Sequence, residues 1–123
     1  MPLHVLICDD SSISRKMVKK AVSIALKEEV EISQAQNGVE ALEAYHNGKA
    51  DIMFLDLTMP EMDGFSVLEK LKEEHAKTVV IVISADIQPE AQKRVFELGA
   101  TAFIKKPITP EDLNKKIHEI GIL

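Results

Sequence analysis

Five short apolar runs, rich in β-branched side chains, alternate along the chain with longer segments of mixed polarity. The runs occupy residues 3–8, 31–35, 51–55, 79–83 and 102–104. Within each run the apolar stretch is nearly continuous, which is typical of strands buried on both faces of a parallel sheet. We therefore predict five strands in one sheet that is covered on both sides.

The longer segments repeat their apolar positions with the period of an α-helix. They occupy residues 12–28, 39–47, 65–74, 89–98 and 111–120. In the first segment, one stripe collects the apolar side chains Ile13, Met17, Ala21, Ile24 and Ala25. Gly48 and Gly99 are typical helix ends, and Thr109 with Pro110 is a typical helix start. Each predicted strand is thus followed by a predicted helix.

Five strand–helix units in series define the fold class. Strands joined by helices run parallel, with right-handed crossovers. We predict an α/β protein, a doubly wound three-layer sandwich around a five-stranded parallel sheet. A length of 123 residues fits a single domain over 1–123. In such folds ligands bind at the carboxyl ends of the strands.

Composition excludes several classes of protein. The net charge of −5, the absence of Trp and the single Tyr argue against nucleic acid as a partner. The apolar runs are far shorter than the ~20 residues of a membrane span, so we expect no membrane partner. The N-terminus has no basic leader, and the lone Cys8 suits a reducing compartment. We expect a cytoplasmic protein.

Reactive side chains follow four of the five predicted strands. Asp9 and Asp10 follow the first, Asp56 follows the third, and the fourth and fifth lead to Ser84 and Lys106. The second strand is followed by turn residues with no reactive group. Because the carboxyl ends of parallel strands meet at one edge of the sheet, we expect these five side chains to lie together.

The chemistry of this set favours phosphoryl transfer. Crowded carboxylates repel one another, and a hard divalent ion such as Mg²⁺ is the simplest remedy. A phosphate-like group near Asp56 would meet the metal, the Lys106 ammonium and the Ser84 hydroxyl, which neutralise developing charge. Asp56 would then be the nucleophile, because a carboxylate can carry a phosphoryl group as an acyl phosphate.

These residues resemble a known family. Asp9–Asp10, the segment FLDLTMPEMDG at 54–64, Ser84–Ala85 and Lys105–Lys106–Pro107 are similar to the receiver domains of two-component response regulators. The resemblance covers essentially the whole chain and is nearest to the stand-alone, chemotaxis-type members. It implies a flavodoxin-like fold with strand order 2-1-3-4-5.

The resemblance also implies roles for the site residues. Asp56 would be the phosphoacceptor. Asp9, Asp10 and Asp56 would hold Mg²⁺ together with the backbone carbonyl of Thr58 and waters, and Lys106 would contact the phosphoryl group.

A conformational switch is implied as well. Ser84 would swing toward the phosphoryl group and Phe103 would follow inward, which changes the surface of the fourth helix, fifth strand and fifth helix. The Lys106–Pro107 peptide bond is expected to be cis. Thr58 and Phe103 stand where motor-binding members carry Asn and Tyr, and Thr58 and Asp86 are expected to modulate dephosphorylation.

The expected function is that of a single-domain response regulator with no other enzymatic activity. Its partners would be a histidine kinase or histidine phosphotransfer protein and a downstream protein target, with the chain a monomer or weak dimer. We expect the kinase side to dock near Ile13, Ser14 and Met17, and the output partner near Phe103 and Lys105. A chemotaxis messenger and a phosphorelay intermediate both remain open.

Other interpretations compete with this one. A phosphatase with an Asp nucleophile would need a general acid at position 58, where Thr stands. A flavin-binding module would need a glycine-rich loop after the first strand, where serines follow Asp9 and Asp10. A receiver that only binds partners is the third alternative. Individually, Asp9 and Asp10 could cap a helix, Asp56 could be a solvated loop residue, and Lys106 and Ser84 could be ordinary surface and strand-end residues.

Overall fold

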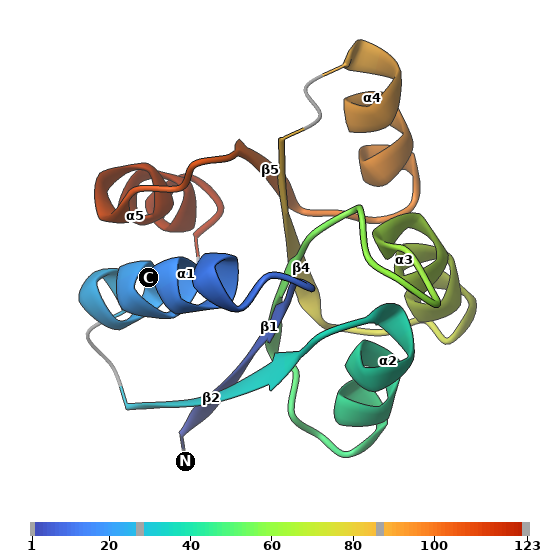
Figure 1. The fold of residues 1–123 in the computed structure, drawn as a ribbon, viewed down its shortest axis with the longest axis horizontal. Helices are drawn as coiled ribbons and strands as arrows, with labels where there is room; N and C mark the ends of the chain where they lie inside the picture. The colour runs from blue at the N-terminus through green and yellow to red at the C-terminus, as the bar shows by residue number, and fades with distance from the viewer. Residues whose placement is uncertain (1, 27–28, 86–87, 122–123) are drawn as a thin grey trace.

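The computed structural model, which describes residues 2–26, 29–85 and 88–121, is a three-layer α/β sandwich (Figure 1). Its five strands all pair in parallel, in the order β2-β1-β3-β4-β5. The strands are β1 (Leu3–Cys8), β2 (Val30–Ala35), β3 (Ile52–Leu55), β4 (Val79–Ser84) and β5 (Ala102–Lys105). The predicted fold class and strand order are confirmed.

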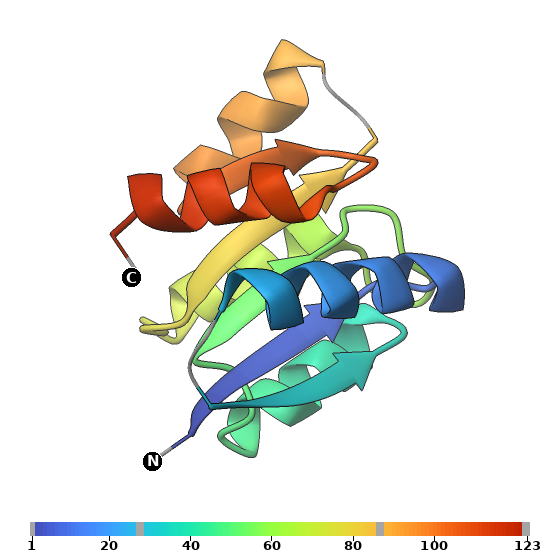
Figure 2. The same ribbon diagram turned by 90° about the vertical axis from the view of Figure 1, so that its left-hand side faces the viewer.

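Helices cover both faces of the sheet. One face carries α1 (Ser12–Ala25) and α5 (Pro110–Glu119), which lie side by side in front of the strands in Figure 2. The opposite face carries α2 (Gly38–His46), α3 (Gly64–Glu73) and α4 (Pro89–Glu97). No helix within the described part of the chain is long and apolar enough to cross a membrane.

Two apolar cores lie on either side of the sheet, because successive side chains of a strand point to opposite faces. In β1, Val5 and Ile7 join the core under α1 and α5, while Leu6 and Cys8 join the core under α2, α3 and α4. The central strand β3 divides in the same way, with Phe54 in the first core and Met53 in the second. This double burial explains the nearly continuous apolar runs of the sequence.

Side chains cap four helices at their N-termini. Thr109 accepts a hydrogen bond from the Asp112 N–H, as its place before Pro110 predicts. Ser11 caps α1 by accepting from the Ser14 N–H, so the interpretation of Asp9 and Asp10 as helix caps is wrong. The corresponding caps of α2 and α3 are Asn37 and Asp63.

The predicted apolar stripe of α1 is wrong in part. Ala21 and Ala25 are buried, but Ile13, Met17 and Ile24 are 71%, 46% and 52% exposed. Val18 and Val22 complete the stripe that meets the core. On a helix of about 3.6 residues per turn, they lie about a third of a turn around the helix from the exposed side chains. The helix also ends at Ala25, before the predicted end at residue 28, because Leu26 already has extended backbone.

Candidate functional site

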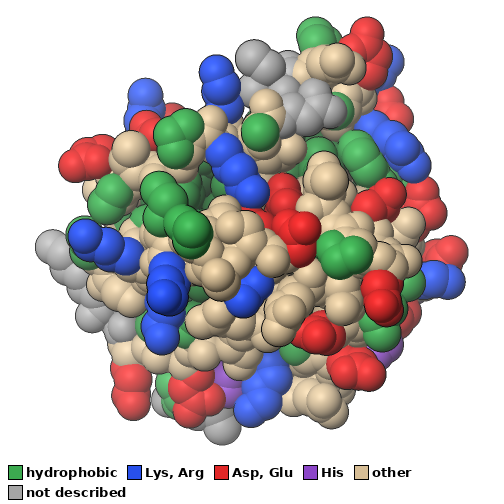
Figure 3. Space-filling view, in the orientation of Figure 1, with side chains coloured by type: hydrophobic (Ala, Val, Ile, Leu, Met, Phe, Trp, Pro, Cys, Tyr) green, Lys and Arg blue, Asp and Glu red, His purple; other side chains and the backbone are tan. Residues whose placement is uncertain are grey.

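The predicted reactive side chains meet at the carboxyl end of the sheet. Carboxylate oxygens of Asp9, Asp10 and Asp56 all lie within 4.8 Å of one another. Figure 3 shows acidic side chains gathered near the centre of one face, with lysine or arginine side chains beside them. The expectation that these carboxylates cluster is confirmed.

The register of the strands explains this convergence. Cys8 of β1 pairs with Leu55 of β3, so the residues that follow, Asp9 and Asp56, leave the sheet side by side. The Asp56 N–H also donates to the Cys8 carbonyl at 2.9 Å. Neighbouring strands therefore carry the two buried carboxylates to one point.

The last two strands deliver the remaining groups in the same manner. Ser84 pairs with Lys105 at the end of the β4–β5 ladder, and the Lys106 N–H donates to the Ser84 carbonyl at 2.9 Å. Ser84 is 2% exposed. The Lys106–Pro107 peptide bond is cis, as the resemblance implies.

The Lys106 ammonium bridges the two buried carboxylates. Its Nζ lies 2.8 Å from Asp9 Oδ2 and 3.5 Å from Asp56 Oδ1. The other carboxylate oxygen of Asp9 accepts a hydrogen bond from the Ser11 N–H at 3.0 Å. Asp9 and Asp56 are 3% and 7% exposed, whereas Asp10 is exposed. Asp56 is thus not a solvated loop residue, and Lys106 is not an ordinary surface lysine.

The two buried carboxyls titrate in opposite directions. Burial raises the pKa of Asp56, the negative charge of Asp9 raises it further, and Lys106 offsets only part of the increase. Burial also opposes ionisation of Asp9, but hydrogen bonds from Lys106, Ser11 and Ser14 outweigh it and lower the pKa of that carboxyl. In the folded protein Asp9 is therefore the more acidic member of the pair.

The donor set fits a hard divalent cation. Three carboxylates supply oxygen ligands, which Mg²⁺ prefers, and their mutual repulsion favours a cation between them. Exposed Asp10 leaves the cluster open to water and ligands on one side. These residues could hold a metal ion.

Two glycines, Gly38 and Gly64, hold the loop after β3 in place. A Cβ on Gly64 would collide with the Asp56 carbonyl oxygen, and a Cβ on Gly38 would collide with Met62. The Gly64 N–H donates to the Leu57 carbonyl and the Gly38 N–H to the Met62 carbonyl, each at 3.0 Å. Their signal in the sequence is that each follows a helix-capping Asn or Asp.

The remaining predicted residues have different surroundings. Thr58 is exposed beside the cluster, and Phe103 is half-buried against the core under α2, α3 and α4. Asp86 lies outside the described residues. Cys8 is buried, and burial raises the pKa of its thiol, which agrees with an inert structural residue.

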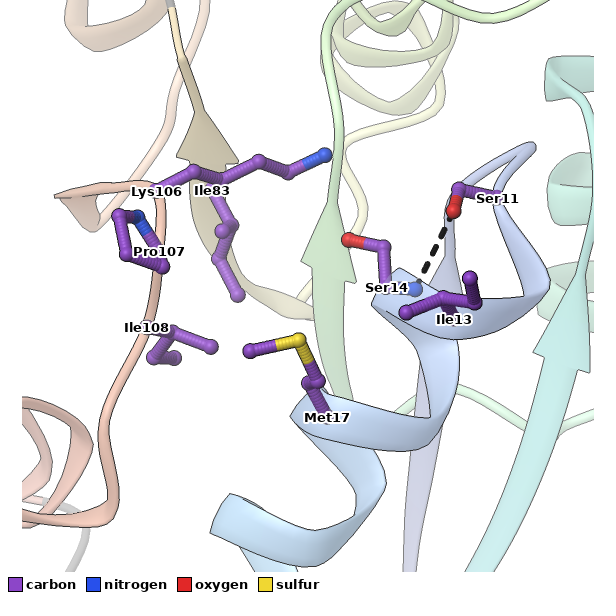
Figure 4. Close-up of a pocket in the computed structure, with 8 residues that line it drawn as sticks. All are labelled: Ser11, Ile13, Ser14, Met17, Ile83, Lys106, Pro107 and Ile108. Atoms are coloured by element: carbon purple, nitrogen blue, oxygen red, sulfur yellow. Dashed lines mark hydrogen bonds between the residues drawn. The ribbon is translucent and has the colours of Figure 1, made fainter.

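A pocket of about 360 Å³ adjoins the site between α1 and the segment after β5. In Figure 4, Met17 and Ile108 approach each other from the two sides, and Lys106 extends past Ile83 toward the end of β3. The pocket is lined by Ser11, Ile13, Ser14, Met17, Ile83, Lys106, Pro107 and Ile108. A ligand or partner on this surface would touch the stem of the lysine that bridges the two carboxylates.

The fold and the acidic rim define the class first: a doubly wound α/β protein with a cation-binding cluster at the carboxyl ends of its strands. The sequence model of the response regulator receiver domain matches residues 5–118, and the chain belongs to that family. The family assignment sets aside the flavin-binding and phosphatase interpretations.

Several relatives resemble the chain along its whole length. Chemotaxis protein CheY of Bacillus subtilis is 33% identical over 120 residues, covering 97% of this chain and 98% of that protein. The chain is also 35% identical to protein-glutamate methylesterase/protein-glutamine glutaminase 3 of Geobacter sulfurreducens, covering 96% of this chain but only 34% of that protein. The likeness to that enzyme is therefore confined to about a third of its length.

Solved structures agree with the sequence relatives. The CheX–CheY–BeF₃–Mg²⁺ complex of Borrelia burgdorferi contains a chain that is 32% identical, with a TM-score of 0.87 over 98% of this chain and 90% of that one. Chemotaxis protein CheY4 of Vibrio cholerae is 28% identical, with a TM-score of 0.84 over 98% and 99%. The chain is a receiver domain with a chemotaxis-type fold.

Proposed function

We propose that this chain is a single-domain response regulator that accepts a phosphoryl group on Asp56 from a histidine kinase or histidine phosphotransfer protein. The observation that carries the proposal is the position of Asp56, a buried carboxylate 3.5 Å from the Lys106 ammonium and within a three-carboxylate cluster. The near full-length match to CheY supports a stand-alone regulator over residues 1–123.

The proposed chemistry is a displacement at phosphorus. A carboxylate oxygen of Asp56 forms a bond to phosphorus, the bond to the donor's imidazole nitrogen breaks, and the imidazole takes up a proton. The product is an acyl phosphate. An ionised carboxylate needs no base, and Lys106 favours the ionised form of Asp56 against the burial that raises its pKa.

Asp9, Asp10 and Asp56, with the backbone carbonyl of Thr58, would hold Mg²⁺. When bound, the metal supplies positive charge beside the transferring phosphoryl oxygens. The relative solved with BeF₃ and Mg²⁺ supports this choice of ion. Lys106 supplies a second positive charge, and its ammonium already lies 3.5 Å from the Asp56 carboxylate.

Phosphorylation would then alter the output surface. The phosphoryl group adds negative charge next to buried Ser84, whose hydroxyl turns toward it as a donor. Half-buried Phe103 on β5 moves into the space that Ser84 leaves. The α4–β5–α5 surface, including Lys105, then changes its affinity for a downstream protein.

The pocket beside α1 is the proposed docking surface for the phosphodonor. Ile13 and Met17 are exposed apolar side chains at its edge, and they lie on the same rim as Asp56. A donor seated there can present its phosphohistidine to Asp56. Both a chemotaxis messenger and a relay intermediate would use this surface, so the pathway is decided by the downstream partner.

The decisive experiment measures the intact mass after incubation with Mg²⁺ and acetyl phosphate. We expect the wild type to gain one phosphoryl group, and Asp56→Asn and a chelator-treated wild type to gain none. Phosphorylation of Asp56→Asn to the same extent would place the acceptor elsewhere. No gain in the wild type with acetyl phosphate or phosphoramidate would instead favour a receiver that only binds partners.

A further inference from the structure

Arg15, in the first turn of α1, ties the loop after β1 to the edge strand β2. One terminal nitrogen of its guanidinium donates to the Asp9 carbonyl oxygen at 2.7 Å. Its Nε donates to Gln34 Oε1 at 2.9 Å. The planar fork therefore spans two segments that are distant in sequence, a geometry that lysine cannot reproduce.

The carbonyl that Arg15 holds belongs to the peptide unit between Asp9 and Asp10. Because a peptide unit is planar, fixing its oxygen also fixes the direction in which the chain reaches Asp10. The Asp9 N–H is held by the Ala35 carbonyl at 3.0 Å, and Asp9 Oδ1 accepts from the Ser11 N–H. Arg15 adds a restraint on the Asp9 carbonyl, so that the N–H, the side chain and the carbonyl of Asp9 are all held by hydrogen bonds.

Asp10 depends on its backbone more than the other two carboxylates do. Asp9 and Asp56 are buried and both contact Lys106. The exposed carboxylate of Asp10 has no hydrogen bond or ion pair within residues 2–26, 29–85 and 88–121. Its place in the cluster therefore rests on the orientation of the peptide that precedes it.

We propose that Arg15 is a positioning residue for the metal site. It restrains the Asp9–Asp10 peptide so that the Asp10 carboxylate faces Asp9 and Asp56 in the metal-free protein. This inference rests on the proposed function, because it assumes that the three carboxylates take up a divalent cation. Arg15 itself touches neither the metal nor the phosphoryl group.

The charge of Arg15 and its positioning role predict opposite changes in metal affinity when Arg15 is replaced. The guanidinium is a cation near the site, so removing its charge alone would tighten binding of a divalent cation. Removing a group that orients ligands weakens binding, typically about 10- to 100-fold. Lys16 provides the matched control, because it is the next residue, exposed and of equal charge, and makes no hydrogen bond or ion pair within the described chain.

The test is a titration with Mn²⁺ alone, followed by the electron paramagnetic resonance signal of the free ion. We expect Arg15→Gln to bind Mn²⁺ about tenfold more weakly than wild type. Lys16→Gln should bind as tightly as wild type or slightly more tightly. Arg15→Lys keeps the charge but has a single donor nitrogen in place of the two that Arg15 uses, so its affinity should fall between those of wild type and Arg15→Gln. Arg15→Gln binding as tightly as wild type, or more tightly, would overturn the inference.

Two further measurements separate positioning from folding and from the proposed function. Amide hydrogen exchange of Asp10 and Ser11 without metal should accelerate in Arg15→Gln, while exchange in β3 stays unchanged. If Arg15→Gln does not fold, Gln34→Ala, which frees one side of the guanidinium, must weaken Mn²⁺ binding for the inference to stand. If wild type binds Mn²⁺ and is phosphorylated, and the variants bind Mn²⁺ as tightly as wild type, the positioning role of Arg15 is refuted and the proposed function stands. Wild type that binds no metal refutes the proposed function as well.

Discussion

Lys106 lies closer to Asp9 than to Asp56, with Nζ 2.8 Å from Asp9 Oδ2 and 3.5 Å from Asp56 Oδ1. The ammonium thus occupies the region between two of the three clustered carboxylates. Burial lowers the pKa of Lys106, but its hydrogen bond to Asp9 and the charges of both carboxylates outweigh burial and raise it. The lysine stays protonated and acts as a counter-ion in the metal-free protein.

Removing this counter-ion should tighten metal binding. In Lys106→Met, a divalent cation no longer competes with the ammonium for Asp9, and the repulsion between the two cations is lost. We expect Mn²⁺ affinity to rise at least about fivefold, because two charges a few ångströms apart at a partly buried site interact by 1 kcal/mol or more. Phosphorylation by acetyl phosphate should become slower, because a charge that stabilises the transferring group is missing.

Lys105→Met is the matched control for Lys106→Met. It removes the same charge from an exposed neighbouring position, so its Mn²⁺ affinity should stay within about twofold of wild type because exposed charges are screened. Weaker Mn²⁺ binding by Lys106→Met would mean that the lysine organises the carboxylates more than it competes with the metal.

The opposite pKa shifts of Asp9 and Asp56 predict opposite stability changes. The pKa of Asp56 is raised in the folded protein, so its stabilising contribution is present below its ordinary pKa and is lost as pH rises through the raised value. The pKa of Asp9 is lowered, so its contribution is present above its ordinary pKa and is lost as pH falls through the lowered value. Ionisation of Asp56 therefore destabilises the metal-free fold, and ionisation of Asp9 stabilises it.

Urea unfolding at pH 7, with a chelator present, should therefore give one variant a higher and the other a lower free energy of unfolding than wild type. We expect Asp56→Asn to be more stable and Asp9→Asn less stable, each by on the order of 1 kcal/mol. The difference for Asp56→Asn should shrink as the pH falls toward the ordinary pKa of a carboxyl, whereas the difference for Asp9→Asn should shrink only as the pH falls below that value. Destabilisation by Asp56→Asn at pH 7 would show that Lys106 outweighs burial and the charge of Asp9.

The architecture follows from the sequence because its signals are local. Continuous apolar runs and helical periods mark every element of the doubly wound sheet. The strand order could be obtained only from the family resemblance, because periodicity does not say which strands are neighbours. Asp9, Asp56 and Lys106 could be placed together because each directly follows a strand, and parallel strands end at one edge.

The sequence-based predictions are wrong or incomplete where tertiary packing determines which side chains are buried or in contact. On α1 two apolar stripes compete, and only the contact with β1 and α5 selects the stripe with Val18 and Val22. Gly38 looks like a turn residue until the loop after β3 is packed against it. The link from Arg15 to β2 carries no local signal, because Arg15 is on α1 and its partner Gln34 lies 19 residues away on that strand.

The close contacts of Gly64 predict a steric cost for a single methyl group. In Gly64→Ala the new Cβ meets the carbonyl oxygen of Asp56 itself, which is backbone and cannot rotate away. We expect a loss of about 1–3 kcal/mol in urea unfolding, as in other overpacked sites. Phosphorylation should also slow, because the backbone that carries Asp56 must shift.

Gly48→Ala separates steric collision from backbone strain. Gly48 has a φ of +75°, but a Cβ there meets nothing within 4 Å. The variant should lose about 1–2 kcal/mol from left-handed backbone alone, with an unchanged rate of phosphorylation. Equal slowing in both variants would mean that general stability, rather than the position of Asp56, controls the reaction.

The exposed apolar stripe of α1, formed by Ile13, Met17 and Ile24, predicts that a variant can lose phosphotransfer from a kinase and keep phosphorylation by acetyl phosphate. Met17 borders the pocket beside the site and is 46% exposed, so Met17→Glu should leave the free energy of unfolding nearly unchanged. Phosphotransfer from a histidine kinase that phosphorylates the wild type should fall at least about tenfold, the effect of losing one central apolar contact of about 1.4 kcal/mol. Phosphorylation by acetyl phosphate, which needs no docking, should not change.

Ile24→Glu is the control for docking, because Ile24 is 52% exposed on the same stripe but lies near the other end of α1 and outside the pocket. It should accept phosphoryl groups from the kinase at nearly the wild-type rate. If Ile24→Glu is impaired as strongly as Met17→Glu, the kinase binds along the whole helix. If neither variant is impaired, the phosphodonor approaches Asp56 from another side, and the exposed stripe of α1 serves a different partner.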